Sequence, residues 1–335
     1  MLIGLAALAA AATGDVPSRD AAFFEAQLAP QSTVALADGR EIHFACMGEG
    51  ETTAVFLGGF GDWGATWHAL VPTVAKSARA CTFDRPGFGL SGPDAEPQGT
   101  MHLVETLAAT LDAAGIEGPV VLVGHSLGGG EALRFAERYP QRVSGLVLVD
   151  PSPPGLMDLV ADNAPEAAAF MESVYREGMA GMARSCLAGL RDGKLVLETG
   201  SASPCAMGAG SFPPAVEEAR LVRLRDPAAW ETKIALIDSL FDGSVPAEMP
   251  KSLGDLPLVV LAAGREDPLP PDTPDGIEEQ FAAVTPLVRQ RLEEIAALSS
   301  QGEYRLVEDA THYIHRDRPD VVLAAIREVL AAAGE

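Results

Sequence analysis

The stretch Pro119–Gly130, PVVLVGHSLGGG, constrains the fold of this chain more than any other. Its consecutive apolar residues, Val120 to Val123, are too few for a helix and β-branched enough for a buried strand. The sequence GHSLG follows at once, and apolar residues at helical spacing come after it. A serine that lies between a strand and a helix, with glycine two positions before and after it, is typical of the tight turn called a nucleophile elbow.

The spacing of this motif has a steric reason. Ser126 sits on a turn with a strained backbone, and the turn presses together the residues two before and two after it, so Gly124 and Gly128 are both glycine. The serine oxygen then lies at a helix N-terminus, where free amides and the helix dipole favour a developing negative charge. We therefore predict Ser126 as a nucleophile and the backbone amide of Leu127 as an oxyanion donor.

Short apolar runs alternate with helical patterns on both sides of this turn. Strands that alternate with helices form a mostly parallel sheet covered on both faces. We therefore predict an α/β fold around an eight-stranded sheet. The predicted strands are Thr33–Leu36, Glu41–Cys46, Thr53–Leu57, Ala78–Phe83, Val120–Val123, Val143–Val149, Pro257–Ala263 and Tyr304–Val307.

The alternation stops between Pro151 and about Asp255. This segment has helical pieces rich in alanine and glutamate, separated by Pro-Pro and Gly-Ser breaks. We predict that 151–255 forms a helical cap inserted after strand six, whereas 31–150 and 256–335 form the core. Some of its apolar residues are expected to line a pocket, although packing between cap helices explains any one of them equally well: Leu156, Met157, Phe170, Met171, Met179, Met182 and Trp230.

Composition limits the partners of this chain. The formal net charge is −23, so long-range repulsion opposes binding to nucleic acid or to an anionic membrane. Hydrophobic residues make up 47% of the sequence, which is enough for a substantial core. We therefore expect no nucleic-acid partner and no stable membrane insertion.

A glycine-rich loop follows the predicted strand Thr53–Leu57. Its sequence, GGFGD, runs from Gly58 to Asp62 and can present bare backbone amides. We predict that it supplies a second oxyanion donor, the amide of Phe60. An ordinary glycine turn is the alternative.

A serine hydroxyl is a poor nucleophile without a base, and the chain contains six histidines. His125 lies inside the elbow, so its side chain should point away from that of Ser126. His312 and His315 follow the last predicted strand, and strand carboxyl ends are where ligands meet an open parallel sheet. His312 is the better base, and His315 is expected to have a local structural or substrate-side role. For the remaining histidines packing or solvent exposure is the default: His43, His68 and His102.

The base needs a carboxylate that fixes its tautomer and stabilises the imidazolium. Asp267 lies in a turn beyond the predicted strand Pro257–Ala263, from which it can reach a neighbouring loop. Glu266 is a local alternative, and Asp150, at the end of the preceding strand, is a more distant one. The chain order of nucleophile, acid and base favours Asp267.

Several motifs together are highly specific: VLVGHSLGG, DRPGFGLS, GGFGDW, GREDP and ATHYIHRDRPD. With them, 31–335 apart from the insertion resembles the serine hydrolases of the α/β-hydrolase fold. That family usually has His-Gly where this chain has Gly58-Gly59, a difference that leaves the Phe60 amide available. The serine nucleophile separates the chain from the haloalkane dehalogenase and epoxide hydrolase branches, which use aspartate.

The resemblance implies a metal-independent and cofactor-independent enzyme that cleaves a carboxylic ester or related acyl bond through an acyl-enzyme. Its triad would be Ser126, His312 and Asp267. An aminopeptidase of the proline-iminopeptidase kind uses the same triad, and it needs cap carboxylates to hold the substrate amine. A catalytically silent binding protein on the same fold is the alternative from another class. The cap carboxylates available for an aminopeptidase are Glu166, Glu172, Glu177 and Glu198.

The first residues resemble part of an export signal. Met1–Ala12 is an apolar run that is too short for the ~20 residues of a membrane span, but it fits a signal h-region followed by small residues. No Lys or Arg precedes it. We predict a signal peptide or apolar N-terminal segment over 1–14 and export to the periplasm or the extracellular space, with the cytoplasm as the alternative.

The chain contains four cysteines, none with metal-ligand spacing. An even count beside a signal-like run favours two disulfides, and three pairings are possible. In the sheet order of the family that the chain resembles, the strands holding Cys46 and Cys81 are neighbours. The resemblance therefore implies a Cys46–Cys81 bridge and leaves Cys186–Cys205 within the cap.

Overall fold

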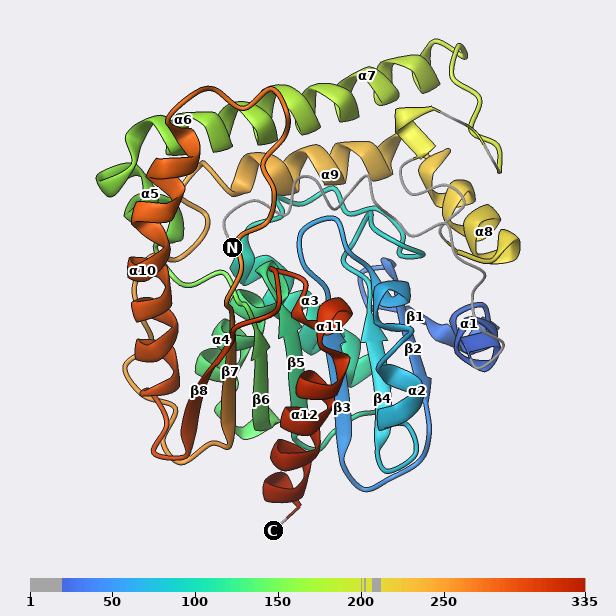
Figure 1. Cartoon of the computed structure of the whole chain (residues 1–335). Helices are drawn as coiled ribbons and strands as arrows, with labels where there is room; N and C mark the ends of the chain where they lie inside the picture. Colours follow the sequence, from blue (N-terminus) through green and yellow to red (C-terminus); the bar gives the residue numbers. More distant parts are fainter. Residues whose placement is uncertain (1–19, 200, 202, 207–211, 335) are drawn as a thin grey trace.

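An eight-stranded sheet is the centre of the computed structural model, in the order β1-β2-β4-β3-β5-β6-β7-β8 (Figure 1). The structure describes residues 20–199, 201, 203–206 and 212–334, so the predicted N-terminal segment 1–14 lies outside the described residues. The strands are β1 (Thr33–Ala35), β2 (Glu41–Met47), β3 (Thr53–Leu57), β4 (Arg79–Phe83), β5 (Val120–His125), β6 (Val143–Val149), β7 (Leu258–Ala263) and β8 (Gly302–Val307).

The strand directions confirm the predicted fold class. Strand β2 runs antiparallel to β1 and β4, and every other neighbouring pair is parallel. The predicted strand ranges agree with the structure within two residues. Because β3, β5, β6 and β7 are parallel neighbours, their carboxyl ends meet at one edge of the sheet.

Both faces of the sheet are covered, which explains why its central strands are continuous apolar runs. Successive side chains of β5 point to opposite faces, so Val121 and Val123 pack in one core and Leu122 packs in the other. The first core includes side chains of α2 (Val71–Val74) and α12 (Pro319–Ala333). The second includes side chains of α3 (Thr100–Ala113), α4 (Leu127–Arg138) and α10 (Ile277–Ala296).

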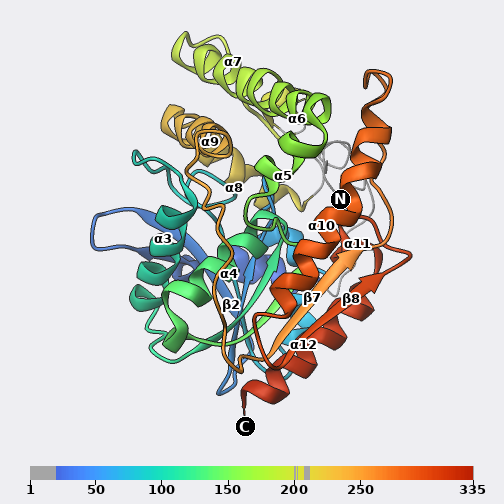
Figure 2. The same ribbon diagram turned by 90° about the vertical axis from the view of Figure 1, so that its left-hand side faces the viewer.

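Residues 151–255 form helices, with no strand among the described residues. Helices α6, α7 and α9 lie above the sheet in both views (Figures 1 and 2). The elements of this upper layer are α5 (Leu156–Asn163), α6 (Pro165–Glu172), the π-helix Ser173–Met179, α7 (Ala180–Arg191), α8 (Pro214–Leu224) and α9 (Pro227–Ser239).

The upper layer is not built from 151–255 alone. Helix α10 contributes Phe281 and Val284 to an apolar cluster with Val160 of α5 and Met171 of α6. The chain segment after β7 therefore rises above the strand ends and shares a core with the inserted helices. The first and last described short helices, α1 (Ala21–Gln27) and α11 (Ile314–Asp317), belong to the sheet layer.

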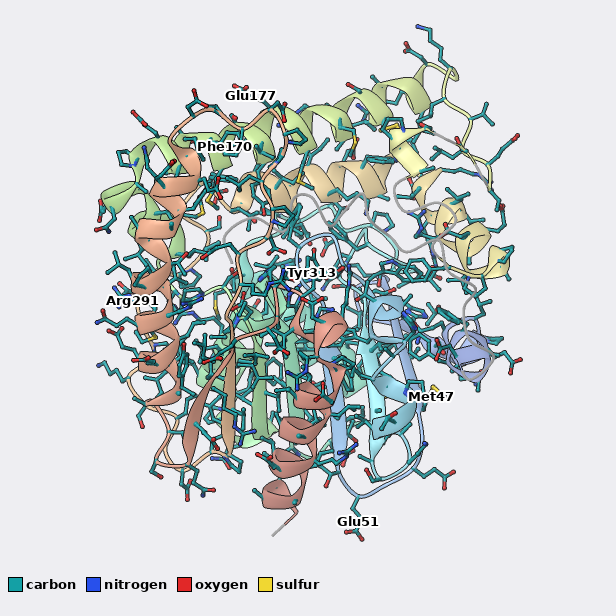
Figure 3. The ribbon with its side chains drawn as sticks, viewed as in Figure 1. Met47, Glu51, Phe170, Glu177, Arg291 and Tyr313 are labelled. Carbon is teal, nitrogen blue, oxygen red and sulfur yellow. A yellow bond between two sulfur atoms is a disulfide. The ribbon has the colours of Figure 1, made fainter. Side chains whose placement is uncertain are left out.

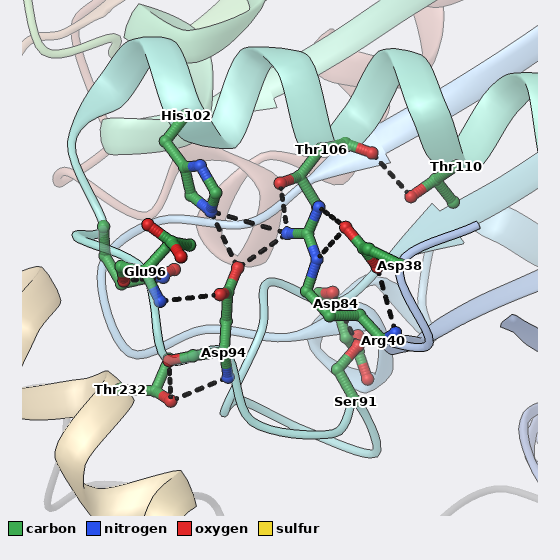
Figure 4. A network of polar contacts seen from close by, with 11 residues as sticks. Asp38, Arg40, Asp84, Ser91, Asp94, Glu96, His102, Thr106, Thr110 and Thr232 are labelled. Carbon is green, nitrogen blue, oxygen red and sulfur yellow. Dashed lines mark hydrogen bonds and ion pairs between the residues drawn. The ribbon is translucent and has the colours of Figure 1, made fainter. Parts of the chain in front are cut away.

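A polar network joins the upper layer to the sheet layer (Figure 4). The carboxylate of Asp94 accepts hydrogen bonds from Arg40 Nη1 at 2.6 Å and from His102 Nε2 at 2.7 Å. Its backbone exchanges two hydrogen bonds with the hydroxyl of Thr232 on α9. His102 thus has a packing role between the two layers, in agreement with its default assignment.

Among the described residues, no helix is both long and apolar enough to cross a membrane.

The structure contains both disulfides that the resemblance implied. Cys46 of β2 is bonded to Cys81 of β4, and the two residues face each other in the antiparallel ladder. Cys186 of α7 is bonded to Cys205 within the upper layer. The bridges span 35 and 19 positions of the chain.

Each disulfide should stabilise the protein by restricting the unfolded chain. On the chain-entropy model a Cys46→Ala/Cys81→Ala variant loses about 4 kcal/mol of unfolding free energy, and a Cys186→Ala/Cys205→Ala variant about 3 kcal/mol. Urea titration of each variant beside the parent measures the losses. Peptide mapping without reduction identifies the linked pairs, and four alkylatable thiols in native, unreduced protein would contradict both bridges.

Candidate active site

Ser126 occupies the strained turn between β5 and α4. Its backbone angles are φ 53° and ψ −120°, in a region that side-chain-bearing residues rarely adopt. Its amide donates to Val149 O at 3.1 Å, and its carbonyl accepts from Ser152 N at 2.9 Å. These contacts with the end of β6 hold the strained turn in place.

The glycines around Ser126 are required by close backbone contacts, as predicted. A Cβ atom on Gly124 would lie 2.4 Å from the carbonyl oxygen of Gly128. A Cβ atom on Gly128 would lie 2.5 Å from the carbonyl oxygen of Gly58. The elbow is therefore pressed against both its own helix and the loop after β3.

His312 is hydrogen bonded to Asp150. The Nδ1–H of His312 donates to Asp150 Oδ2 at 2.6 Å, and Asp150 Oδ1 accepts from the amide of Ala263 at 2.9 Å. Asp150 is only 2% exposed, so water competes little for its carboxylate. The structure thus pairs Nδ1 of His312 with Asp150, the alternative at the end of β6, whereas the chain order favoured Asp267.

A local backbone feature explains the difference. Besides Ser126, Asp150 is the only non-glycine residue with positive φ among the described residues, at 43°. This turn directs the carboxylate across the end of β7, where it meets both Ala263 and His312. Asp267 lies near the same loop, since its charge adds to the effect of burial in raising the pKa of Tyr313.

Ser126, Asp150 and His312 line one cavity of about 230 Å³. Phe60 and Leu127, whose amides were predicted as oxyanion donors, line it too. The Leu127 amide is the first of helix α4 and has no carbonyl partner within the helix. The apolar part of the lining includes Leu156, Met157, Met171, Tyr175, Leu240, Phe241 and Val288.

The upper layer therefore supplies much of the cavity wall, but only some of the predicted residues. Leu156, Met157 and Met171 line the cavity, whereas Phe170 packs against the cluster shared with α10. Trp230 is buried in a separate cluster of the upper layer, and its indole N–H donates to Leu224 O. Met182 packs against the same cluster as Trp230.

Tyr175 is a cavity residue that the sequence analysis missed. Its ring packs edge-on against Phe60 at a centroid distance of 5.3 Å, directly over the loop after β3. Burial raises the pKa of its phenol to about 12, so the hydroxyl stays protonated. It belongs to the π-helix Ser173–Met179, and such irregular turns are frequent at functional sites.

Arg85 fixes the loop after β3, Gly58–Asp62, by hydrogen bonds to its backbone. Its guanidinium donates to the carbonyls of Gly58 and Gly59 at 2.6 and 3.1 Å. It also makes a two-pronged ion pair with Glu131 of α4, at 2.7 and 2.6 Å. Burial raises the pKa of Glu131, and the charge of Arg85 opposes that shift. The pair therefore fixes the loop that carries the Phe60 amide against helix α4, which begins directly after Ser126.

Comparisons with known proteins support the fold. Residues 54–178 match the family model described as the alpha/beta hydrolase fold. The structure is similar to that of a thermophilic esterase from Thermogutta terrifontis, with a TM-score of 0.58 and 22% identity over 90% of this chain and 98% of that one. The chain has the α/β-hydrolase fold.

Curated proteins are similar in sequence to this chain over part of their length. The dihydrolipoyllysine-residue acetyltransferase component of the acetoin cleaving system of Cupriavidus necator is 34% identical over 137 residues, which are 41% of this chain and 36% of that protein. The 2-hydroxymuconate semialdehyde hydrolase of a Pseudomonas strain is 43% identical over 86 residues, 25% of this chain and 30% of that protein. The matched segment thus spans about a third of these relatives.

The carboxylates considered for an aminopeptidase lie elsewhere in this α/β-hydrolase fold. Glu166 accepts a hydrogen bond from Gln280, and Glu172 pairs with Arg176 at the surface. Glu177 lies on the outer side of the upper layer (Figure 3). None of these residues, nor the exposed Glu198, is among the described residues that line the cavity.

The ion pair of Arg85 should matter for stability because both partners are buried. Arg85→Ala leaves the carboxylate of Glu131 uncompensated, so we expect a loss of about 3–5 kcal/mol of unfolding free energy in urea titration. An Arg85→Met/Glu131→Leu variant should recover part of that loss.

Arg305→Ala, which removes a surface ion pair with Glu303 and Glu328, is the matched control and should change the unfolding free energy by at most about 1 kcal/mol. A loss for Arg85→Ala no larger than this control would contradict the role given to the buried pair.

Proposed function

We propose that this protein is a serine hydrolase that cleaves a carboxylic ester or a related acyl bond. The observation that carries the proposal is the hydrogen bond from His312 to Asp150 in the cavity that Ser126 also lines. The Asp150 carboxylate fixes the tautomer of His312 with its proton on Nδ1, which leaves Nε2 free to accept a proton. That arrangement is what activation of a serine hydroxyl requires.

The reaction then has two halves. Ser126 Oγ attacks the substrate carbonyl carbon while His312 Nε2 takes the hydroxyl proton, and His312 returns that proton to the leaving alkoxide as the ester bond breaks. In the second half His312 accepts a proton from water, whose oxygen attacks the acyl-enzyme. Breakdown of this second intermediate releases the acid and returns the proton to Ser126 Oγ.

Backbone amides of Phe60 and Leu127 stabilise the negative oxygen in both halves. Fixed donors act on charge that exists only in the intermediates and transition states, so they lower the barrier without binding the ground state more tightly. Arg85 supports this arrangement, because it holds the carbonyls that precede Phe60. Loss of one such donor typically lowers the rate by about 10²–10³-fold.

We also propose that 151–255 acts as a cap that selects the substrate. Its helices lie over the strand ends, and its side chains Met171, Tyr175 and Phe241 line the cavity. The apolar wall favours an acyl or aromatic group. Glu166, Glu172, Glu177 and Glu198 lie outside the described cavity lining, but Asp158 of α5 lines it, so an aminopeptidase stays the second candidate.

The names of similar proteins support a hydrolase of small acyl compounds. They include a 2-hydroxymuconate semialdehyde hydrolase, a lipase of Mycobacterium tuberculosis and a thermophilic esterase. We further propose that the protein is exported, since two disulfides persist best in an oxidising compartment.

Three substitutions test the catalytic residues. Ser126→Ala should abolish hydrolysis of p-nitrophenyl butyrate and labelling by a fluorophosphonate, with little change in Tm. Asp150→Asn should lower kcat by about 10⁴-fold because it disturbs the tautomer of His312. Asp267→Asn is the control and should have a far smaller effect. A reversed order of the two aspartates would return the acid role to Asp267, and a parent protein that resists the probe would favour a silent binding protein.

A second experiment tests the cap. Phe241→Ala removes a side chain from the cavity wall and so enlarges the cavity, which should favour the longer acyl chain. The ratio of kcat/KM for p-nitrophenyl octanoate to that for p-nitrophenyl acetate should rise by about tenfold. Phe170→Ala removes an equal side chain outside the cavity lining and should leave the ratio unchanged. Labelling by a small fluorophosphonate should be similar in both variants. Equal ratios in the parent and in Phe241→Ala would refute the cap as the element of specificity.

A further inference from the structure

A buried cluster of three side chains lies behind the catalytic residues. Asp62, His125 and His315 each place one ligand-type atom within 4.8 Å of the others. The three residues are 6%, 1% and 2% exposed. They come from the loop after β3, the end of β5 and helix α11, so the fold gathers them from distant parts of the chain.

One ring nitrogen of His125 has a lone pair that accepts no hydrogen bond. Nε2 lies 3.0 Å from the backbone carbonyl of His312, and a carbonyl can only accept, so Nε2 carries the proton. The other ring nitrogen, Nδ1, is buried and has no hydrogen-bond partner among the described residues. The lone pair of Nδ1 then faces Asp62 Oδ2 at 3.5 Å.

Asp62 presents a negative charge to this lone pair. The Arg316 guanidinium beside Asp62 favours the ionised carboxylate. Its other oxygen, Oδ1, accepts from Arg316 Nη2 at 3.2 Å. Two electron-rich atoms therefore face each other inside the protein, where a cation between them would be strongly favoured.

His315 adds a third donor with no partner. Among the described residues, neither of its ring nitrogens has a hydrogen-bond partner, and Nδ1 of His125 has none either. The His315 ring is buried, and its two nitrogens lie among the end of β5 and the loop after β3. A buried imidazole with no polar contact is costly, and a metal ion is one ligand that satisfies it.

We propose that Asp62, His125 and His315 bind a divalent transition-metal ion, preferentially Zn²⁺. Neutral imidazole nitrogens and one carboxylate oxygen form a common zinc ligand set, with a fourth position for water. Two further contacts fit this assignment. His125 donates its other ring N–H to a backbone carbonyl and Asp62 is held by Arg316, as outer contacts orient ligands in metal sites.

The site has no part in the proposed chemistry, and its effect would be structural. It would join the loop that carries Phe60, the strand that ends at Ser126 and the loop that carries His312. Because the ligands are buried, the ion would enter during folding and exchange slowly. A metal here is thus separate from the metal-independent hydrolysis proposed above.

Metal content provides the test. The protein, without a polyhistidine tag, is produced in zinc-supplemented medium, dialysed, and analysed by inductively coupled plasma mass spectrometry. We expect about one Zn²⁺ per chain in the parent and less than about 0.1 in His315→Gln and Asp62→Asn. Tm should fall when the parent is unfolded and refolded with a chelator, and should recover when Zn²⁺ is present during refolding.

His68→Gln is the matched control, because it removes a different histidine paired with an aspartate, Asp20, and should leave the zinc content unchanged. A parent protein that contains no zinc would overturn the proposal. The cluster would then be stabilised by a proton shared between His125 and Asp62, or by a water molecule. Equal zinc in the parent and in both ligand variants would place the ion elsewhere and also overturn it. Because neither readout is activity, failure here leaves the proposed function untouched.

Discussion

The close approach of backbones around Ser126 is the constraint on which the rest of the site depends. Gly124, Gly128 and Gly58 belong to three segments that meet without room for a Cβ atom. This contact fixes strand β5, helix α4 and the loop after β3 relative to one another. The strained φ of 53° at Ser126 persists because the surrounding segments leave the turn no other conformation. Steric exclusion thus places the proposed nucleophile, Ser126, and one proposed oxyanion donor, the Leu127 amide.

Asp150 extends the same principle to the neighbouring strand. Its positive φ is the second strained backbone position, and it follows β6, which pairs with β5. The hydrogen bond from Ser152 to the carbonyl of Ser126 ties the two strained turns together. The carboxylate then spans from the Ala263 amide to His312, so the ends of β6 and β7 jointly set the position of the proposed base.

The contrast between Ser126 and Asp150 shows what a sequence can predict. Ser126 is identified by glycines two positions away, because the steric requirement is local and leaves a fixed spacing. The proposed acid, in contrast, could follow either of two neighbouring strands, β6 or β7. Which carboxylate meets His312 depends on the backbone angle φ of Asp150, which leaves no pattern in the sequence. Tyr175 and Val288 were missed for a related reason, since cavity lining depends on how the upper layer and α10 pack together. The pairing of β2 with β4 and the two disulfides were predictable because the motifs identified a known topology.

Side-chain polar contacts, most of them buried, hold the loops of the site instead of ladder hydrogen bonds. Arg85 with Glu131 fixes one loop, Asp62 with Arg316 connects it to α11, and the Asp84 carboxylate accepts from the amides of Gly64 and Leu90. An apolar core of the same volume would often be as stable, since desolvation opposes buried charges. Directional contacts, however, allow only one arrangement of each loop, whereas apolar contacts tolerate several. A site that must position amides and a base to within fractions of an ångström gains more from that uniqueness than from extra stability.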